Sequence, residues 1–206
     1  MIQLSILTPA VPSRIEQVNG LRAMIAAQIR DNMPIEHLIL FDNKRRTVGE
    51  KRDALLRIAL GEYVAFVDDD DFVSDDYVAL ILQKTWLGPD VITFRQQATV
   101  NDQIAEIEFR LGHPNQPFLP GTLVKRNAWH ICAWRRSLAI ASHFPASNYG
   151  EDWAFAAPLC QVAKTEEHIP KTLHFYRHYS DSTEAPHPSV MLSSQRQRPA
   201  ESSVAE

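Results

Sequence analysis

Length, composition and charge exclude several classes of protein. The 206 residues are 45% hydrophobic and 22% charged, which is ordinary for a folded chain with its own core. A formal net charge of -4 gives no overall attraction for nucleic acid or an anionic membrane. Cys132 and Cys160 are too few for a disulfide framework, and we expect both to be buried, reduced thiols. No segment approaches the roughly 18 apolar residues of a spanning helix, so we expect a soluble, cytoplasmic protein.

The first half of the chain alternates strand and helix patterns. Apolar runs end at Pro, Gly or Asp, and the segments between them carry apolar residues at steps of three and four. Strands are predicted at 3–8 (ended by Pro9 and Pro12), 37–41, 63–67 and 91–94, and helices at 14–30, 51–60 and 74–86, the last capped by Ser74. This order predicts an α/β fold with a mostly parallel sheet between helices.

The second half has weaker patterns. Loose alternation over residues 98–111 predicts antiparallel strands, and further strands are expected at 118–124 and 173–179. Helices are expected at 127–136 and 152–162. We predict a single domain over residues 1–183, divided at about residue 95, and a mobile polar tail over 184–206, which is rich in Pro, Ser and Gln.

Four consecutive aspartates, Asp68 to Asp71, follow the third strand. They fall at the carboxyl edge of the predicted sheet, where open α/β sheets bind ligands. Carboxylates crowded together need a cation, and oxygen ligands suit Mg²⁺ or Mn²⁺ held jointly with substrate phosphates. Two alternatives stay open: a solvated loop in which Asp71 or Ser74 caps the next helix, and a phosphatase in which Asp68 is the nucleophile. The loop lacks the Gly and Glu positions of an EF-hand.

Three linked motifs resemble family 2 glycosyltransferases. GEYVAFVDDDDFVSDDYV (61–78) resembles the family's strand and DxD motif, LSILTPAVPSR its first strand and nucleotide loop, and VGEKRDALLRIALGE the helix between them. HLILFDN ends in Asp42 at the position that faces the base in the family. The resemblance implies a GT-A, Rossmann-like fold for nucleotide-diphospho-sugar transfer, with residues 1–95 binding the nucleotide-sugar and 96–183 building the acceptor and catalytic half.

The same resemblance assigns roles on the donor side. It implies that Thr8 and Pro9 line the nucleotide pocket, that Asp42 meets the base, and that Arg52 approaches the nucleotide or the diphosphate. Asp68 and Asp69 would contact the donor. Asp70 would bind Mn²⁺ or Mg²⁺. Lys51 departs from the family pattern, which has Ala or Gly at this position. The donor expected from the family is a UDP-sugar.

The remaining implied residues lie late in the chain. NYGEDWAFA (148–156) resembles the family's ED motif, which makes Asp152 the catalytic base of an inverting transfer and Glu151 its neighbour. Both acids would also favour a helix start through capping and the dipole. LHFYRHYSDST (173–183) resembles the family's YRxHxxSTS segment, so His178 is the second candidate metal ligand, with His174 on the same strand face.

The acceptor is not identified by the sequence. Trp129 and Trp134, interleaved with Lys125, Arg126, Arg135 and Arg136, would suit a glycan, a lipid-linked acceptor or modified nucleic acid, but would equally suit a helix with solvated arginines. A nucleotide-sugar-binding module without transfer activity is a further alternative. A nucleotidyltransferase is not favoured, because TPAVPSRIEQ lacks the expected Gly-rich loop.

Overall fold

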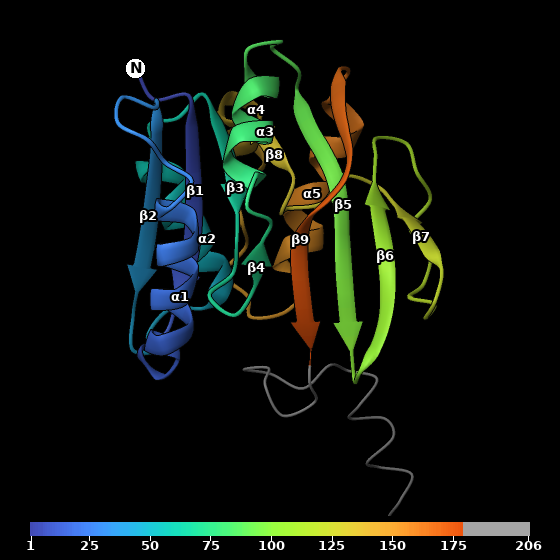
Figure 1. Ribbon diagram of the computed structural model, residues 1–206, viewed down its shortest axis with the longest axis horizontal. Coiled ribbons are helices and arrows are strands. Elements are labelled where there is room, and N and C mark those ends of the chain that lie inside the picture. Colours follow the sequence, from blue (N-terminus) through green and yellow to red (C-terminus); the bar gives the residue numbers. More distant parts are fainter. Residues whose placement is uncertain (179–206) are drawn as a thin grey trace, which may run out of the picture.

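The computed structural model describes residues 1–178 (Figure 1), so the predicted tail and Tyr179 lie outside the described residues. The strands are β1 (Leu4–Ala10), β2 (Ile35–Phe41), β3 (Tyr63–Phe66), β4 (Phe72–Val73), β5 (Val91–Val100), β6 (Gln103–Phe109), β7 (Leu123–Arg126), β8 (Ala133–Arg135) and β9 (Glu166–His178). The helices are η1 (Pro12–Arg14), α1 (Ile15–Ala26), α2 (Val48–Ile58), α3 (Tyr77–Thr85), α4 (Arg136–Ser142) and α5 (Glu151–Val162). The predicted β-α-β-α-β order of the first half is confirmed.

A single mixed sheet runs through the molecule in the order β2-β1-β3-β8-β5-β6-β7. The pairs β1–β2 and β1–β3 are parallel, whereas β8 is antiparallel to both β3 and β5. The last strand, β9, runs parallel to β5 along its length and also pairs with β4. The carboxyl ends of β1, β3, β5 and β9 therefore lie on one side of the sheet (Figure 1).

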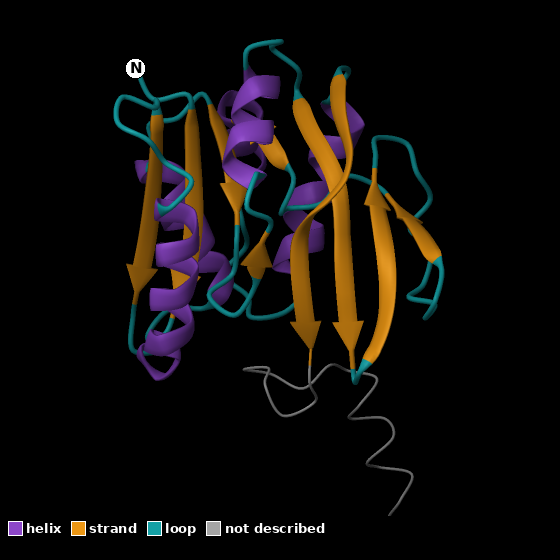
Figure 2. Ribbon diagram, viewed as in Figure 1, coloured by secondary structure: helices purple, strands orange, loops and turns teal. Residues whose placement is uncertain are grey.

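Helices cover both faces of the sheet. Figure 2 shows α1 and α3 in front of the strands and α2, α4 and α5 behind them. A capping box fixes the start of α2: Thr47 Oγ1 accepts from the Glu50 backbone N–H at 3.2 Å, and Glu50 Oε2 accepts from the Thr47 backbone N–H at 2.7 Å. The central strands thus lie between two helical layers, as the predicted architecture requires.

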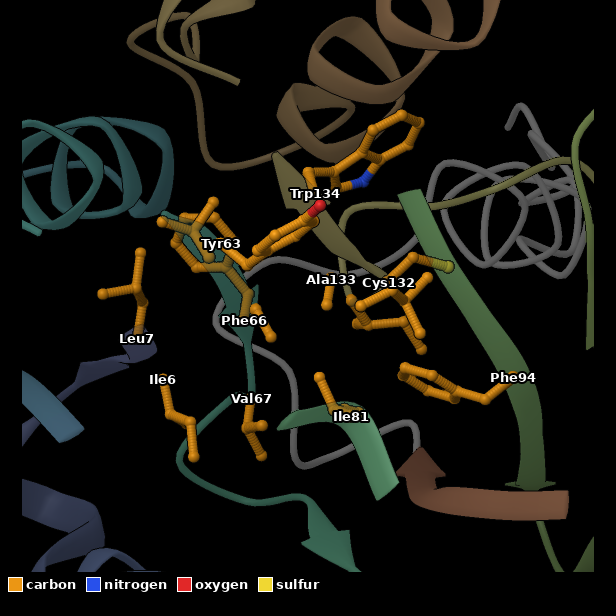
Figure 3. Packing of buried hydrophobic residues seen from close by; sticks show 14 of the residues in the cluster. Ile6, Leu7, Tyr63, Phe66, Val67, Ile81, Phe94, Cys132, Ala133 and Trp134 are labelled. Atoms are coloured by element: carbon orange, nitrogen blue, oxygen red, sulfur yellow. The ribbon is translucent and has the colours of Figure 1, made fainter. Parts of the chain in front are cut away.

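The core is densest where β8 enters the sheet. Trp134, Phe66 and Tyr63 are fully buried there, and Figure 3 shows them converging from β8 and β3. The Trp134 indole is also hydrogen-bonded, its Nε1 donating to the Trp129 carbonyl oxygen at 2.9 Å. A large aromatic side chain with a satisfied N–H stabilises the junction between the two halves of the chain.

The structure corrects the prediction that Pro9 ends the first strand. β1 continues to Ala10, with Pro9 opposite Leu40 of β2. Val67 N donates to Leu7 O, and Asp42 N to Ala10 O. By alternation the Pro9 nitrogen faces the β3 side, beyond the end of β3 at Phe66. The missing N–H therefore removes no hydrogen bond from the sheet.

The predicted helix over residues 127–136 is wrong. That segment is a loop followed by strand β8, and the helix α4 starts only at Arg136. Trp134 and Ala133 of this segment are buried because β8 lies between β3 and β5. Arg135 does not reach an acceptor site: it bonds Glu62 at 3.0 Å and the Pro89 carbonyl at 3.1 Å.

Other boundaries shift by several residues. The strand expected at 118–124 is β7, at Leu123–Arg126, and β9 begins at Glu166 rather than residue 173. Helix α3 starts at Tyr77, and the hydroxyl of Ser74 donates to Asp76 instead of capping the helix. The antiparallel strands predicted over 98–111 are confirmed as the β5–β6 hairpin, whose turn residues Asn101 and Asp102 have φ of 47° and 62°.

Cys132 is buried and Cys160 partly buried, both as free thiols. Among residues 1–178, no helix combines the length and the hydropathy needed to cross a bilayer.

Candidate active site

A cleft of about 980 Å³ opens at the carboxyl ends of the parallel strands. Its walls come from both halves of the chain: the loop after β1, helix α2 and the acidic loop after β3, together with β5, β9 and the start of α5. Asp68, Asp69, Asp70, Glu151 and Asp152 all line it. The fold therefore brings the two predicted acidic motifs to one cleft.

Arg52 of α2 joins these two motifs. Its guanidinium donates to both oxygens of Asp68, at 2.8 and 2.6 Å, and through Nη1 to Glu151. Burial lowers the pKa of Arg52, but attraction to Asp68 and Glu151 outweighs it and raises the pKa. Burial alone would raise the pKa of Asp68. Attraction to Arg52 and His130 outweighs burial, so the pKa of Asp68 is lowered. Arg52 therefore ties the Asp68 carboxylate to the start of α5.

Asp69 ties the acidic loop to the chain after β1. It is 3% exposed and accepts from the Val11 backbone N–H at 3.0 Å and from Arg14 Nη1 at 2.7 Å. Burial raises the pKa of Asp69, with Arg14 opposing. Although Asp69 lines the cleft, its two oxygens are engaged by the protein itself, which makes it a positioning group for the loop.

Asp70 is the carboxylate of the loop that is placed most openly. About 33% of its side chain is exposed, and Arg14 Nη1 approaches its Oδ2 at 3.2 Å. Burial raises the pKa of Asp70 to about 6; Arg14 opposes the shift, and Asp68 and Asp69 add to it. Additional positive charge next to this carboxylate would relieve the repulsion.

Asp71, which lines the cleft, forms a buried pair with His174. Asp71 Oδ2 lies 3.3 Å from His174 Nε2, and His174 Nδ1 lies 3.1 Å from Gln96 Nε2. Burial and then Asp68 raise the pKa of Asp71 well above its usual range, whereas burial lowers the pKa of His174 to about 4. His174 therefore connects β9 to the acidic loop and does not itself line the cleft.

The acid pair at the start of α5 has two separate environments. Glu151 is 6% exposed and engaged by Arg52, and burial raises its pKa although Arg52 opposes the shift. Asp152 is more open and lines the cleft, with Oδ1 accepting from the Trp153 backbone N–H at 2.7 Å. Of the two, Asp152 has the more open carboxylate.

Of the other residues predicted to bind the donor, only some line the cleft. Pro9 lines the cleft, but Thr8 does not: it is fully buried, and its Oγ1 lies 3.0 Å from His37 Nε2. Asp42 lies at the end of β2 beside the cleft, where its Oδ1 is 3.3 Å from Lys51 Nζ. Lys51 itself is 2% exposed and lines the cleft. Pro9 and Lys51 therefore line the cleft, and Asp42 contacts Lys51 from outside it.

His178 lines the cleft from the end of β9, together with Tyr176. Burial raises the pKa of the Tyr176 hydroxyl, and the charges of Asp71, Asp68, Asp70 and Asp152 act in the same direction. Tyr176 thus lies within the field of both acidic motifs. Within the described part of the chain, no three His, Cys, Asp or Glu side chains are grouped as a ready-made metal site.

Three cleft residues were not identified from the sequence as site residues: Arg14, His130 and Asp71. Arg14 follows the first strand in the motif that resembles the nucleotide loop, which was the available signal. His130 lies in a segment interpreted as a helix, and only the pairing of β8 brings it to the cleft. Asp71 was weighed as a cap but is buried against His174.

The fold and the cleft define the class of the protein. A parallel sheet between helices, with an acidic loop after its third strand facing a cleft, is the GT-A architecture. A crystal structure of S. aureus TarS 1-349 matches with a TM-score of 0.62 and 15% identity, covering 85% of this chain and 60% of that one. The same fragment in complex with UDP-GlcNAc matches with a TM-score of 0.65 and 14% identity, covering 88% and 60%.

The sequence itself gives the family. Residues 22–140 match the model of glycosyl transferase family 2. This chain belongs to that family. The match ends before Glu151 and Asp152, and no curated protein matches the sequence. The chain spans about 60% of the TarS fragment, so the likeness establishes the fold.

Proposed function

We propose that this chain transfers a sugar from a UDP-sugar to an acceptor hydroxyl, with inversion at the anomeric carbon. The observation that carries the proposal is the Arg52 bridge, which fixes the acidic loop after β3 against the acid pair of α5 on one cleft. A donor held by the first motif would present its anomeric carbon to an acceptor activated by the second. That TarS is described in complex with UDP-GlcNAc supports uridine as the donor base.

The donor would lie along Pro9, Lys51 and Asp68. Lys51 and Arg52 supply buried positive charge beside the cleft, which suits a diphosphate. Asp68, held rigidly by Arg52, would accept from a ribose or sugar hydroxyl. Asp42 would accept a hydrogen bond from the base. Lys51, which contacts Asp42, would connect this group to the cleft.

The residues present fit a divalent cation held jointly with the donor. Asp70 offers a partly exposed carboxylate whose raised pKa reflects unrelieved crowding, and His178 lines the same cleft. Magnesium is commonly held by one or two carboxylates together with substrate phosphates, so a three-residue protein site is not required. When bound, Mn²⁺ or Mg²⁺ would offset charge developing on the leaving diphosphate.

Asp152 would act as the base. As the acceptor oxygen attacks the anomeric carbon, the new C–O bond forms, the bond to the diphosphate breaks, and the hydroxyl proton passes to the Asp152 carboxylate. Attack from the face opposite the diphosphate inverts the configuration. Glu151, engaged by Arg52, would hold the start of α5 in place and would not receive the proton.

The test is thermal unfolding with UDP, GDP and a set of UDP-sugars, with and without Mn²⁺, followed by assay of donor turnover. A ligand at 100 times its dissociation constant stabilises a fold by about 2.7 kcal/mol. We expect a cation-dependent shift for uridine nucleotides that Asp70→Asn abolishes. The exposed Asp75 is the matched control, and Asp75→Asn should behave as wild type. Full turnover without a divalent cation would refute the mechanism.

A further inference from the structure

His130 has unmet hydrogen-bonding capacity beside the cleft. Its ring is 7% exposed, and within residues 1–178 neither ring nitrogen has a hydrogen-bond partner. Buried polar groups are nearly always paired, and each unpaired one costs about 1–3 kcal/mol. His130 nevertheless lines the cleft, so a ligand is the natural source of the missing partners.

The loop that carries His130, between β7 and β8, is held firmly. The Trp129 carbonyl accepts from Trp134 Nε1 at 2.9 Å and from the Cys132 N–H at 3.0 Å. One residue earlier, the Ala128 carbonyl accepts from Cys160 Sγ at 3.2 Å. The ring is therefore presented by a rigid support, which favours selective recognition over adaptable binding.

The charge state of the ring limits what it can bind. Burial and then Arg52 lower the pKa of His130 to about 3, so the imidazole is neutral at physiological pH. A neutral imidazole offers one donor and one acceptor. That pair matches a hydroxyl group, which both donates and accepts, and it suits a phosphate or a carboxylate poorly.

The surroundings of the ring indicate which hydroxyl it meets. His130 lines the same cleft as Asp152, the proposed base, and Asp68, the proposed donor carboxylate, and the negative charges of both act on the ring. In the reaction proposed above, the group between those two carboxylates is the sugar being transferred.

We propose that His130 hydrogen-bonds a hydroxyl of the transferred sugar and thereby selects the donor. This inference rests on the proposed function. It assigns His130 to the sugar itself, whereas the nucleotide and the diphosphate are bound elsewhere in the cleft. His130 is a specificity-determining residue in this view, and it takes no part in proton transfer.

The experiment is calorimetric binding, with Mn²⁺, of UDP, UDP-glucose, UDP-galactose and UDP-GlcNAc to wild type, His130→Phe and His130→Gln. We expect His130→Phe to bind UDP as wild type does, but to bind the preferred UDP-sugar about tenfold more weakly and to lose its preference among the sugars. His130→Gln, which can still donate and accept, should keep part of the preference, and it carries the test if the Phe variant does not fold.

The matched control is His168→Phe. His168 also has a buried Nε2 without a hydrogen-bond partner, 3.7 Å from Glu108 Oε1, but it lies outside the cleft, so its substitution should leave the sugar preference unchanged. An equal loss for UDP and UDP-sugars in His130→Phe, or an unchanged sugar preference, would overturn the assignment while the proposed function stands. If wild type binds no nucleotide-sugar, the proposed function and this assignment fall together.

Discussion

The two halves of the chain reach the cleft in different ways. In residues 1–95 each strand is followed by its helix, and the acidic loop is placed by a parallel pair of neighbouring strands. In residues 96–178 the cleft residues arrive through distant pairings: β8 lies between β3 and β5, and β9 pairs along β5. Local sequence patterns therefore place the acidic loop, whereas pairing between distant strands builds the opposite wall of the cleft.

The acid pair of α5 tests this division most strongly. Asp152→Asn should lower kcat by about 10²- to 10⁴-fold, because a positioned general base is lost. Its melting temperature and its affinity for UDP should match wild type. Steady-state kinetics with a UDP-sugar and thermal unfolding make the measurement.

Glu151→Gln is the comparison for that variant. It leaves Arg52 with one fewer buried carboxylate, but Asp68 still compensates the guanidinium charge and the Gln oxygen can still accept from Arg52, so we expect a cost of about 1 kcal/mol. Its melting temperature should fall clearly. Equal melting temperatures for the two variants would show that Arg52 does not join the halves.

Trp134→Ala should destabilise the fold by about 3–5 kcal/mol, because a fully buried indole leaves a cavity at the junction of β3, β8 and β5. Urea unfolding gives the value. Trp86, 65% exposed, is the control, and Trp86→Ala should cost within about 0.5 kcal/mol. A similar small cost for both would mean that β8 is not part of the core.

Gly49→Ala should disturb the contact between the halves. A Cβ at Gly49 would lie 1.9 Å from the Pro145 carbonyl oxygen, so the loop before α5 must move. A displacement of about 1 Å near a reacting group can cost on the order of 10²-fold in rate. We expect kcat to fall by up to that factor while UDP binding persists. Gly20→Ala, with nothing within 4 Å, should be neutral or slightly stabilising.

The smallest expected effect concerns Asp90, which lies at the start of β5. Partial burial raises its pKa, but the N–H groups of Lys164 and Thr165 outweigh this and hold the pKa below the usual 3.8. The carboxylate therefore stabilises the fold above about pH 4, and this contribution is lost as the pH falls through the lowered value. Asp90→Asn should cost about 0.5–1 kcal/mol at pH 7. Unfolding curves of the two proteins should converge below pH 4; a constant difference would contradict the assignment.

The sequence predicts the first half well because its signals are local. Strands such as 63–67 are continuous apolar runs, and the DxD motif follows one of them directly. The prediction that Pro9 ends the first strand was wrong because the Pro9 nitrogen faces β3, which ends before reaching it. The strand can therefore continue without the missing N–H. Where β3 ends is not local information.

The second half was less predictable for the same physical reason. The segment around Trp134 has helical spacing, yet β8 forms there because two other strands offer it a place in the sheet. His130 could not be assigned to the cleft without that pairing. This side of the cleft depends on strand pairings between residues far apart in the sequence.

The docking of α2 has a consequence for engineering. The first backbone N–H groups of α2 do not face the cleft: Val48 N donates to Asn148 Oδ1 at 2.9 Å, and Gly49 N donates to Ser147 O at 2.9 Å. The N-terminus of α2 thus holds the segment that leads into Glu151 and Asp152. A chimera that exchanges residues 96–178 for those of another family member must preserve these two hydrogen bonds, because otherwise Glu151 and Asp152 will be displaced relative to the acidic loop after β3.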